Sequence, residues 1–441
     1  MVQIKNLSWG RYPRVQQRSL ELDWLEGVSV PEGRESVLPY GMGRSYGDSC
    51  LNAGGLLLVT RRLNRLISFD NESGLVRCEC GVTLADLAEW GLKRGWFLPV
   101  TPGTKFVTVG GAIANDVHGK NHHRAGTFGA HVPRFELLRS NGERLICSAD
   151  QNNALYRATI GGLGLTGLIT WAEVRLRRAP NAFIDMQSVK FGSLEEFFQI
   201  SGESDQDYEY TVAWMDCVST GANFGRGIFM RGNHSSKESR DLPRVPIKLP
   251  LKVPFDLPSF TLNNFTVRAF DACYYHKQRA AVVNKTCYYD PFFYPLDAVE
   301  DWNRIYGKRG FLQFQCVVPG RLEQSGIKTI LEVIVKSGSA SFLAVVKEFG
   351  SAVSAGMLSF PTAGVTLCLD FPNQGARTLD LFQKLYGMTC SMGGRVYPAK
   401  DACMSPGNFQ TFYPGWREFA EHVDPRFSSS FWRRVTEQEA A

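Results

Sequence analysis

Apolar and polar residues alternate in short runs through the first 180 residues, which is the pattern of half-buried β-strands. Residues 83–95 differ, because their leucines recur at helical spacing and the segment ends in glycine, as an amphipathic helix does. An Asn-Gly pair within residues 131–148 predicts a β-hairpin, since this dipeptide suits a tight turn. The other elements predicted here are strands at residues 54–60, 66–70, 74–82 and 168–177 and a helix at residues 153–160.

After Pro180 the pattern changes: residues 193–203 have helical spacing, and three later segments alternate like strands. Residues 232–258 fit neither element, because they are first polar and then rich in proline, with apolar and basic residues interleaved. We expect a mobile loop there, either in contact with a lipid surface or a plain surface excursion. Mixed helices and strands in a chain of 441 residues predict an α+β protein of two domains. The three predicted strands are residues 208–218, 310–319 and 364–372.

Charge and cysteine content narrow the class of protein. The net charge of +6 is mild and its basic residues are spread out, which argues against a nucleic-acid binder. The 11 cysteines are scattered and form no CxxC pair. The amino terminus lacks an apolar signal core, and no run approaches the roughly 18 apolar residues of a membrane span. We therefore expect free thiols and a reducing compartment.

Two glycine-rich segments have to be weighed as phosphate sites. Gly162, Gly164 and Gly167 match GxGxxG formally, but a helix is predicted before them and a strand after them. A dinucleotide site of the Rossmann type needs the opposite order, so we reject it. Residues 39–48 match neither that motif nor a Walker loop. From the residues alone, they are either an anion-binding nest or a surface turn.

Residues 107–132 hold four of the seven histidines, which raises the question of a metal site. His118 and His122 are four residues apart, but Gly119 between them makes a helix improbable, and a metal is not expected. The glycine-rich run at Gly110 and Gly111 is more typical of backbone wrapped around a cofactor.

Three motifs, at residues 39–48, 102–119 and 161–170, together resemble the FAD-binding domain of the vanillyl-alcohol oxidase superfamily, in the family's order and spacing. The resemblance implies a two-domain α+β fold of the PCMH type, with a substrate domain built on an antiparallel sheet. It implies an FAD-binding domain at 1–179, a substrate domain at 180–392 and a return to the first domain at 393–441. Residues 41–55, 117–132, 292–319, 367–372 and 393–402 are similar to the members that act on a polyprenyl-phosphoryl ribose.

By this resemblance, two glycine-rich loops hold the FAD diphosphate and the third motif contacts the adenosine half. Many members tether FAD through a histidine in the first loop, where this chain has Arg44, Ser45 and Tyr46, so we expect non-covalent FAD. The residues implied in FAD binding are Gly41, Gly43, Arg44, Ser45, Tyr46, Gly47, Gly103, Thr108, Val109, Gly110, Gly111, Asn115, His118, Gly167, Ile169 and Tyr397.

The resemblance makes Lys400 the base, or the group that orients the substrate hydroxyl, with His118 and Gln315 as further catalytic residues. Gln313 and Gln315 alternate with Phe314 on a predicted strand, so both amides face one side, where they can bind sugar hydroxyls. The residues implied in substrate binding are Lys120, Trp214, Gln313, Gln315, Cys368 and Lys400.

The implied reaction is FAD-dependent oxidation of the 2′-hydroxyl of a polyprenyl-phosphoryl-β-D-ribose to the 2′-keto sugar. This is the first half of an epimerisation to the arabinose lipid of cell-wall arabinan biosynthesis. It implies an NADH-dependent keto-reductase as partner and a cytoplasmic enzyme, peripheral at the inner membrane. Two alternatives stay open: a sugar-lactone or polyol oxidase on the same fold, and a non-enzymatic metal-binding protein that uses the histidines.

Overall fold

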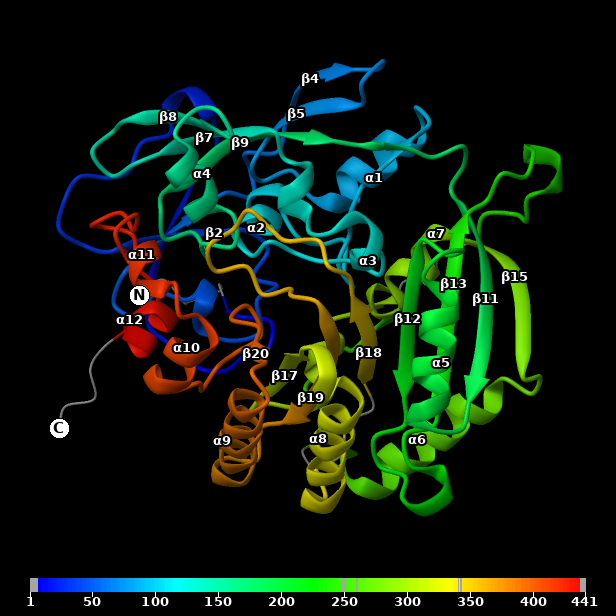
Figure 1. Cartoon of the computed structure of the whole chain (residues 1–441). Helices are drawn as coiled ribbons and strands as arrows, with labels where there is room; N and C mark the ends of the chain where they lie inside the picture. Colours follow the sequence, from blue (N-terminus) through cyan, green and yellow to red (C-terminus); the bar gives the residue numbers. More distant parts are fainter. Residues whose placement is uncertain (1–6, 247–250, 259–260, 340, 342, 437–441) are drawn as a thin grey trace.

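The computed structural model describes residues 7–246, 251–258, 261–339, 341 and 343–436. In Figure 1 the blue and cyan elements occupy the upper part, and a large green-to-orange sheet lies below them. Helices and mainly antiparallel sheets are mixed throughout, which confirms the predicted α+β class.

The upper part contains a five-stranded antiparallel sheet and a three-stranded parallel sheet. The five-stranded sheet has the order β4 (Leu66–Asp70), β5 (Leu75–Glu79), β9 (Leu168–Arg175), β7 (Arg134–Leu138) and β8 (Arg144–Ser148). The parallel sheet has the order β1 (Arg18–Glu21), β3 (Leu56–Val59) and β2 (Val37–Tyr40). The helices are α1 (Leu84–Leu92), α2 (Val109–Ala114), α3 (His122–Ala125) and α4 (Asn153–Thr159).

The lower part is an eight-stranded antiparallel sheet. Its order is β15 (Val282–Tyr288), β11 (Phe183–Phe191), β13 (Gly227–His234), β12 (Tyr210–Met215), β18 (Ala344–Phe349), β19 (Gly364–Pro372), β17 (Phe311–Val318) and β20 (Arg395–Val396). The helices that accompany it are α5 (Leu194–Ser204), α6 (Asn264–Lys277), α8 (Glu323–Ser337) and α9 (Ala376–Ser391).

The two faces of this sheet differ because successive side chains of a strand point to opposite sides. On β17, Leu312 and Phe314 belong to the core shared with the helices, whereas Gln313 and Gln315 line a cavity. Strands β18 and β19 follow the same rule, and their cavity residues are Val345, Lys347, Thr366 and Cys368. One face therefore anchors the sheet on helices, and the other forms the wall of the cavity.

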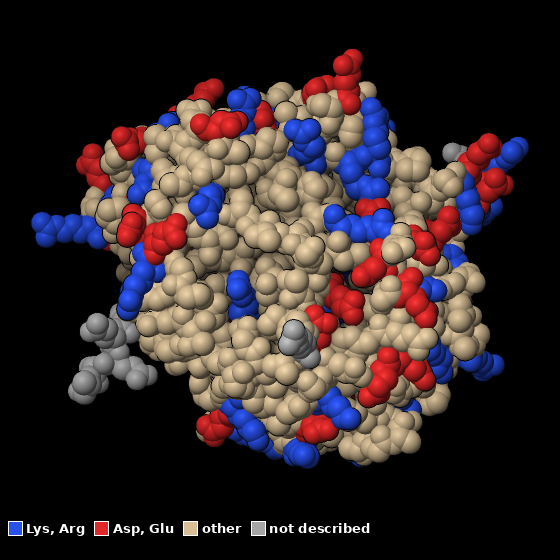
Figure 2. All heavy atoms as spheres, viewed as in Figure 1, with Lys and Arg blue, Asp and Glu red and all other residues tan. Residues whose placement is uncertain are grey.

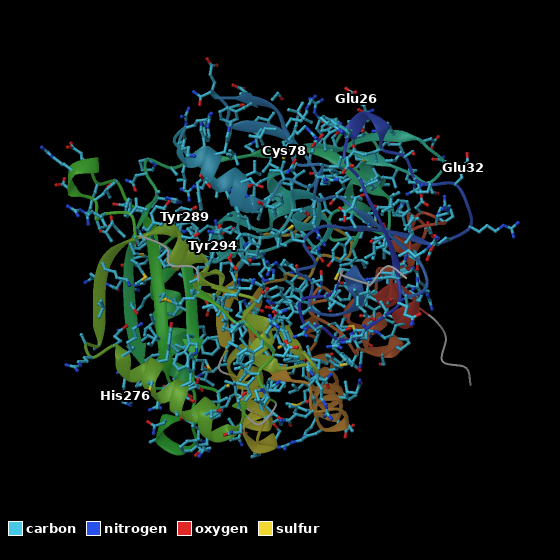
Figure 3. All side chains as sticks on the ribbon, turned by 180° about the vertical axis from the view of Figure 1, so that it is seen from behind. Glu26, Glu32, Cys78, His276, Tyr289 and Tyr294 are labelled. Carbon is cyan, nitrogen blue, oxygen red and sulfur yellow. The ribbon has the colours of Figure 1, made fainter. Side chains whose placement is uncertain are left out.

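Aromatic side chains join the two parts of the molecule. Tyr289 and Phe293 of α7 (Tyr289–Phe293) contact Phe97 of β6 (Trp96–Phe97), with ring centroids 5.5 Å apart in both pairs. The hydroxyl of Tyr294 lies 2.7 Å from that of Thr101. Figure 3 shows Tyr289 and Tyr294 at this junction, seen from behind. All of these rings are buried, so the junction is part of the hydrophobic core.

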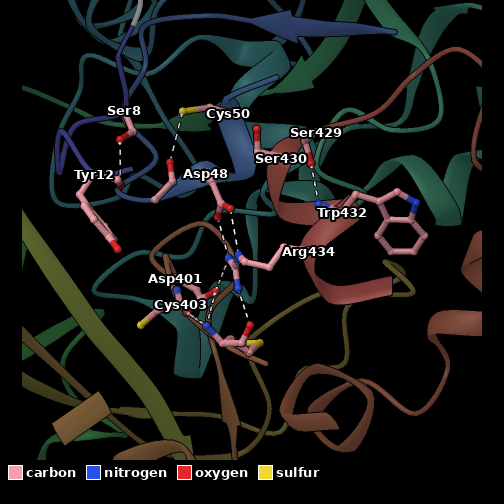
Figure 4. A network of polar contacts seen from close by, with 12 residues as sticks. Ser8, Tyr12, Asp48, Cys50, Asp401, Cys403, Ser429, Ser430, Trp432 and Arg434 are labelled. Carbon is pink, nitrogen blue, oxygen red and sulfur yellow. Dashed lines mark hydrogen bonds and ion pairs between the residues drawn. The ribbon is translucent and has the colours of Figure 1, made fainter. Parts of the chain in front are cut away.

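The carboxyl-terminal helices return to the first part of the chain. Arg434 donates to Asp48 at 2.7 and 2.9 Å and to Asp401 at 2.8 Å, as Figure 4 shows. Both carboxyl groups are almost fully buried. This cation therefore ties the last helix to the first glycine-rich loop and to the segment after β20. The helices are α10 (Pro406–Phe412), α11 (Trp416–Ala420) and α12 (Ser430–Thr436).

The predicted elements are found close to their expected bounds. The helix expected at 83–95 is α1, which begins directly after its N-cap Thr83, and Thr83 and Asp86 form a capping box. The hairpin at 131–148 is β7–β8, and Gly142 in its turn has φ +88°. Short additional elements are β10 (Arg177–Arg178), β14 (Leu251–Lys252), β16 (Val299–Glu300), η1 (Leu25–Gly27), η2 (Asp48–Cys50), η3 (Phe128–His131), η4 (Gly221–Asn223), η5 (Ser239–Asp241), η7 (Pro295–Ala298), η8 (Trp302–Tyr306) and η9 (Gly320–Leu322).

The expectation of a loop over 232–258 is wrong at its start. Residues 232–234 belong to β13, because Gly232 pairs with Met186 and the ladder continues to His234. Residues 251–252 pair with 299–300 as a short parallel ladder. Residues 247–250 of the expected loop lie outside the described part of the chain.

The face shown in Figure 2 carries no patch of a single charge. On the face shown in Figure 2, acidic and basic side chains are interspersed. Within the described residues, no helix is both long and apolar enough to cross a bilayer.

Candidate functional site

A cavity of about 360 Å³ lies where the glycine-rich loops of the upper part meet the large sheet. The loops at 41–50, 101–120 and 163–169 form one side, and strands β12, β17, β18 and β19 form the other. The residues predicted for FAD that line it are Gly41, Gly43, Arg44, Ser45, Tyr46, Gly103, Thr108, Gly110, Gly111, Asn115, His118, Gly167, Ile169 and Tyr397. Those predicted for substrate that line it are Lys120, Trp214, Gln313, Gln315, Cys368 and Lys400.

The structure places two predicted FAD residues away from this lining. Val109 is fully buried in the hydrophobic core. A Cβ at Gly47 would lie 1.6 Å from the carbonyl oxygen of Asp401, so Gly47 packs the first loop against the segment after β20. Both residues support the loops from behind the cavity.

The glycines allow the loops of the cavity wall to pack closely against their neighbours. A Cβ at Gly41 would lie 2.5 Å from Oγ1 of Thr108, and one at Gly110 would lie 3.0 Å from the Cβ of Cys80. Gly43 has φ +63°, which favours glycine. Thr108 caps α2 by accepting a hydrogen bond from the N–H of Gly111. Gly103 also lines the cavity and has no atom within 4 Å of the position of a Cβ, so its backbone is open to a ligand such as the diphosphate of FAD.

The first loop presents no histidine to the cavity. The Arg44 guanidinium lies 3.9 Å from the ring centroid of Trp9, and burial lowers its pKa. Tyr46 is buried and packs edge-on against Phe311. Cys50 follows on η2 and also lines the cavity.

Lys400 extends into the cavity beside the first loop. Its Nζ lies 3.7 Å from the ring centroid of Tyr46, and its backbone N–H donates to the carbonyl of Tyr397. Burial lowers the pKa of Lys400 to about 8, and the nearby Cys368 and Asp370 oppose this shift. An amine with this pKa is available as a base near neutral pH.

Asp370 is a buried carboxyl group that the sequence did not single out. It accepts a hydrogen bond from the Gln313 amide, which lies opposite it in the β17–β19 ladder. Burial raises the pKa of Asp370 to about 7, although Gln313 and Lys400 oppose the shift. Asp370 thus fixes the Gln313 amide and faces the amine of Lys400.

His118 and Gln315 meet across the cavity wall. The Gln315 amide nitrogen lies 3.0 Å from His118 Nε2 and 3.3 Å from Thr366 Oγ1. Burial holds the pKa of His118 well below its usual range, so the ring is neutral. With the amide as donor, Nε2 accepts and the ring proton is on Nδ1.

A row of four residues crosses the sheet on the cavity side. Gln315 pairs with Cys368, Cys368 with Val345, and Val345 with Trp214. Burial raises the pKa of the Cys368 thiol to about 12, so it lines the wall as a neutral group. Trp214 contacts Tyr274 of α6, with ring centroids 4.7 Å apart.

Lys347 is a cavity residue that the sequence reasoning missed. It lies on β18, opposite Thr366, and its Nζ donates to the carbonyl of Gly119 at 2.9 Å. Burial lowers its pKa to about 7, and the neighbouring Lys120 adds to the shift. The signal that could have revealed it is a lysine that directly follows the apolar run 343–346 at the strand position that continues the alternation from Val345.

The four clustered histidines do not converge. His123 lies 3.0 Å from the carbonyl of Tyr208, and His131 lies 2.9 Å from that of Ala125. His122 packs against Phe349, and only His118 of the four lines the cavity. Among the described residues, no group of three or more His, Cys, Asp or Glu side chains could hold a metal ion.

Comparisons with known proteins agree with this geometry. A family model described as an FAD binding domain matches residues 30–148. The decaprenylphosphoryl-beta-D-ribose oxidase of Mycolicibacterium smegmatis is 38% identical over 420 residues, which cover 92% of this chain and 90% of that protein. An uncharacterized protein of Streptomyces coelicolor is 31% identical over 80% of this chain and 100% of its own length. The D-lactate dehydrogenase of Anaerostipes hadrus is 28% identical over only 32% of this chain and 31% of its own.

Proposed function

The chain belongs to the FAD-dependent oxidoreductase family that includes decaprenylphosphoryl-beta-D-ribose oxidase, and we propose that it oxidises the 2′-hydroxyl of a polyprenyl-phosphoryl-β-D-ribose to the 2′-keto sugar. One observation carries the proposal. The glycine loops that fit FAD and the amine of Lys400 open onto the same cavity, whose opposite wall carries Gln313 and Gln315, and Gln315 contacts His118 of the second loop. A flavin and a hydroxyl-bearing substrate can therefore meet beside a base.

In this proposal Lys400 takes the proton of the 2′-hydroxyl. The neutral amine is the reactive form, and burial makes it accessible near pH 8. Bound FAD supplies the acceptor for the hydride from the carbinol carbon. Asp370 faces Lys400 and stabilises the ammonium that forms when the proton arrives.

The other wall residues hold the sugar. Gln313 is fixed by Asp370, and Gln315 is fixed between His118 and Thr366, so both amides are preorganised for ribose hydroxyls. Trp214 and Cys368 lie in the same row across the sheet and provide apolar surface beside them. Lys120 lines the cavity next to this row and suits the substrate phosphate.

We propose that FAD is held without a covalent bond. The support is the first loop, where Arg44, Ser45 and Tyr46 stand in place of a tethering histidine. Acid precipitation should release the yellow colour into the supernatant. Colour that remains in the pellet would reveal a covalent flavin.

We also propose that the chain divides into segments 1–179, 180–392 and 393–441, with the third segment returning to the FAD-binding domain.

A cytoplasmic location at the inner face of the membrane is proposed because the substrate is a lipid and the 11 cysteines are free thiols. Membrane contact through the described part of 232–258 is supported by exposed Val245, Leu251 and Phe255. An NADH-dependent keto-reductase would consume the product and complete epimerisation to the arabinose lipid.

A visible spectrum of the purified protein, followed by anaerobic addition of a polyprenyl-phosphoryl-β-D-ribose, tests the function. A flavin spectrum that bleaches on addition is the expected result. A flavin that stays oxidised with this lipid but bleaches with a soluble polyol or sugar lactone would move the proposal to that substrate class.

A further inference from the structure

Three lysines line the cavity, and two of them lack an acidic partner. Lys400 faces Asp370, as described above. Within the described residues, neither Lys120 nor Lys347 forms an ion pair with a carboxylate, and each donates only to a backbone carbonyl. The acceptors are Gly119 for Lys347, at 2.9 Å, and Phe293 for Lys120, at 3.4 Å. Each ammonium has three donors, so most of their hydrogen-bonding capacity points elsewhere.

The surroundings of these two amines contain no compensating charge. The titratable groups that face Lys347 come from three directions: His118, His122 and Lys120 from the loop and α3, Cys368 from β19, and Lys400 from the segment after β20. All of them are cationic or neutral.

Lys120 lies 5.9 Å from the ring centroid of Phe292, and burial alone lowers its pKa to about 8. Two like charges enclosed in this way destabilise the empty cavity and are stabilised by an anion.

Resting on the function proposed above, we propose that Lys120 and Lys347 together form an anion site that binds the phosphodiester of the substrate. Lys347 lies two residues along β18 from Val345 of the sugar row and on the same face, so the site adjoins the place assigned to the ribose. The enzyme thereby selects a phosphoryl ribose over a neutral riboside.

The FAD diphosphate is the other anion that Lys120 and Lys347 could bind. It is assigned to the glycine loops at 41–47 and 103–111, whereas Lys347 comes from β18 of the large sheet and lies opposite Thr366 of β19. If the bound anion is the substrate phosphodiester, replacing Lys347 lowers the affinity for substrate, and if it is the FAD diphosphate, the replacement lowers the affinity for FAD. Loss of substrate affinity supports the proposal, and loss of FAD affinity contradicts it.

Binding of an anion favours the charged form of both amines, so binding takes up protons. The free amines titrate with pKa values of about 7 for Lys347 and about 8 for Lys120. Affinity for a phosphorylated ligand is therefore highest below pH 7 and falls as the pH rises through 7 to 8. A neutral ligand has no such dependence.

The test uses the FAD-loaded enzyme and two probes, farnesyl-phosphoryl-β-D-ribose and farnesyl β-D-ribofuranoside, which lacks the phosphate. Anaerobic stopped-flow reduction of the flavin separates the Kd of each probe from the limiting rate. We expect Lys347→Met to raise the Kd of the phosphorylated probe about 10- to 100-fold, with a smaller effect on the limiting rate. The Kd of the riboside should not change. Lys384→Met, at an exposed lysine of α9, is the matched control and should alter neither value.

Lys347→Arg keeps the charge at every pH, so the Kd of the phosphorylated probe should vary less between pH 6.5 and pH 9 than in the native enzyme. Equal effects of Lys347→Met on both probes, or weaker binding of FAD alone, would overturn the anion site while the proposed function stands. If neither probe reduces the native flavin, the proposed function fails, and this inference fails with it.

Discussion

The Gln315 amide nitrogen lies 3.0 Å from Nε2 of the neutral His118, and the two residues are 197 positions apart in the chain. The contact joins the glycine-rich loop of the upper part to the large sheet. His118 is held in place by aromatic rings, with Phe349, Phe360 and Tyr397 at centroid distances of 4.9, 5.6 and 5.3 Å. The amide therefore meets a ring that has little freedom to move, and together they fix one edge of the sugar site.

Gln315→Leu removes this contact and the bond to Thr366 while keeping the side-chain volume. We expect FAD to remain bound and the rate of flavin reduction to fall about 10- to 100-fold, because the substrate hydroxyl is no longer oriented. Anaerobic stopped-flow absorbance measures the rate. Thr366→Val removes only the weaker 3.3 Å bond and is the matched control. A normal rate in Gln315→Leu would mean that the amide does not touch the reacting sugar.

Lys400→Ala removes the proposed base. The expected result is an enzyme that retains FAD but reduces it about 10² to 10⁴ times more slowly with substrate, as for other losses of a general base. Lys400→Arg provides the comparison, because it keeps a cation beside Asp370 yet cannot lose its proton. If the role of Lys400 is to remove the proton, both variants should reduce the flavin slowly. Activity in Lys400→Arg alone would assign the lysine to charge stabilisation instead.

The pH dependence follows from the same residue. Burial lowers the pKa of Lys400 to about 8, and the reactive form is the neutral amine. The limiting rate of flavin reduction should therefore rise as the pH increases through 8 and level off above it. Measurement at saturating substrate from pH 6 to pH 10 separates this rise from the loss of affinity expected at Lys347. A limiting rate that falls over this range would contradict the assignment.

Gly41→Ala tests the cradle for FAD. The new Cβ would lie 2.5 Å from Oγ1 of Thr108, so the cap of α2 must break or the two loops must separate. We expect the Kd for FAD to rise about fivefold to tenfold, since a lost helix cap costs about 1 kcal/mol and about 1.4 kcal/mol corresponds to a factor of ten. Gly387→Ala in α9 is the control, because no atom lies within 4 Å of its Cβ. Titration of the apoprotein with FAD, followed by fluorescence, gives both constants.

Much of the cavity wall could be predicted from local pattern. Alternation along residues 310–319 placed Gln313 and Gln315 on one face, and both line the cavity. Local pattern marks Lys347 as a charged residue after an apolar run, but it does not show that the side chain reaches the cavity, because that depends on the pairing of β18 between β12 and β19, which brings together residues far apart in the chain. The same holds for Asp370, whose partner Gln313 is 57 residues away. Local periodicity predicts on which face of a sheet a side chain lies, whereas the order of the strands determines which residues of other strands lie beside it.

Replacement of Arg434 tests whether the last helix stabilises the loop that lines the cavity. Arg434→Met would leave Asp48 and Asp401 buried without their cation, and breaking such a pair costs about 3 kcal/mol or more. Arg18→Met is the control, because Arg18 is largely exposed and solvent screens its ion pair with Glu35, so the free energy of unfolding should change little. Urea unfolding of the holoenzyme, followed by flavin and tryptophan fluorescence, measures both.

The loss in Arg434→Met should depend on pH in a defined direction. Burial already raises the pKa of Asp48, and without the guanidinium the main influence that opposes this rise is lost. A carboxyl group with a raised pKa favours the folded state when it is protonated, so the variant should regain stability as the pH falls from 7 to 5. Because Asp48 belongs to the first glycine-rich loop, FAD affinity should weaken at pH 7 and recover in parallel with stability. A stability deficit that stays constant over this range would show that the lost packing of the arginine stem, and not its charge, holds the last helix in place.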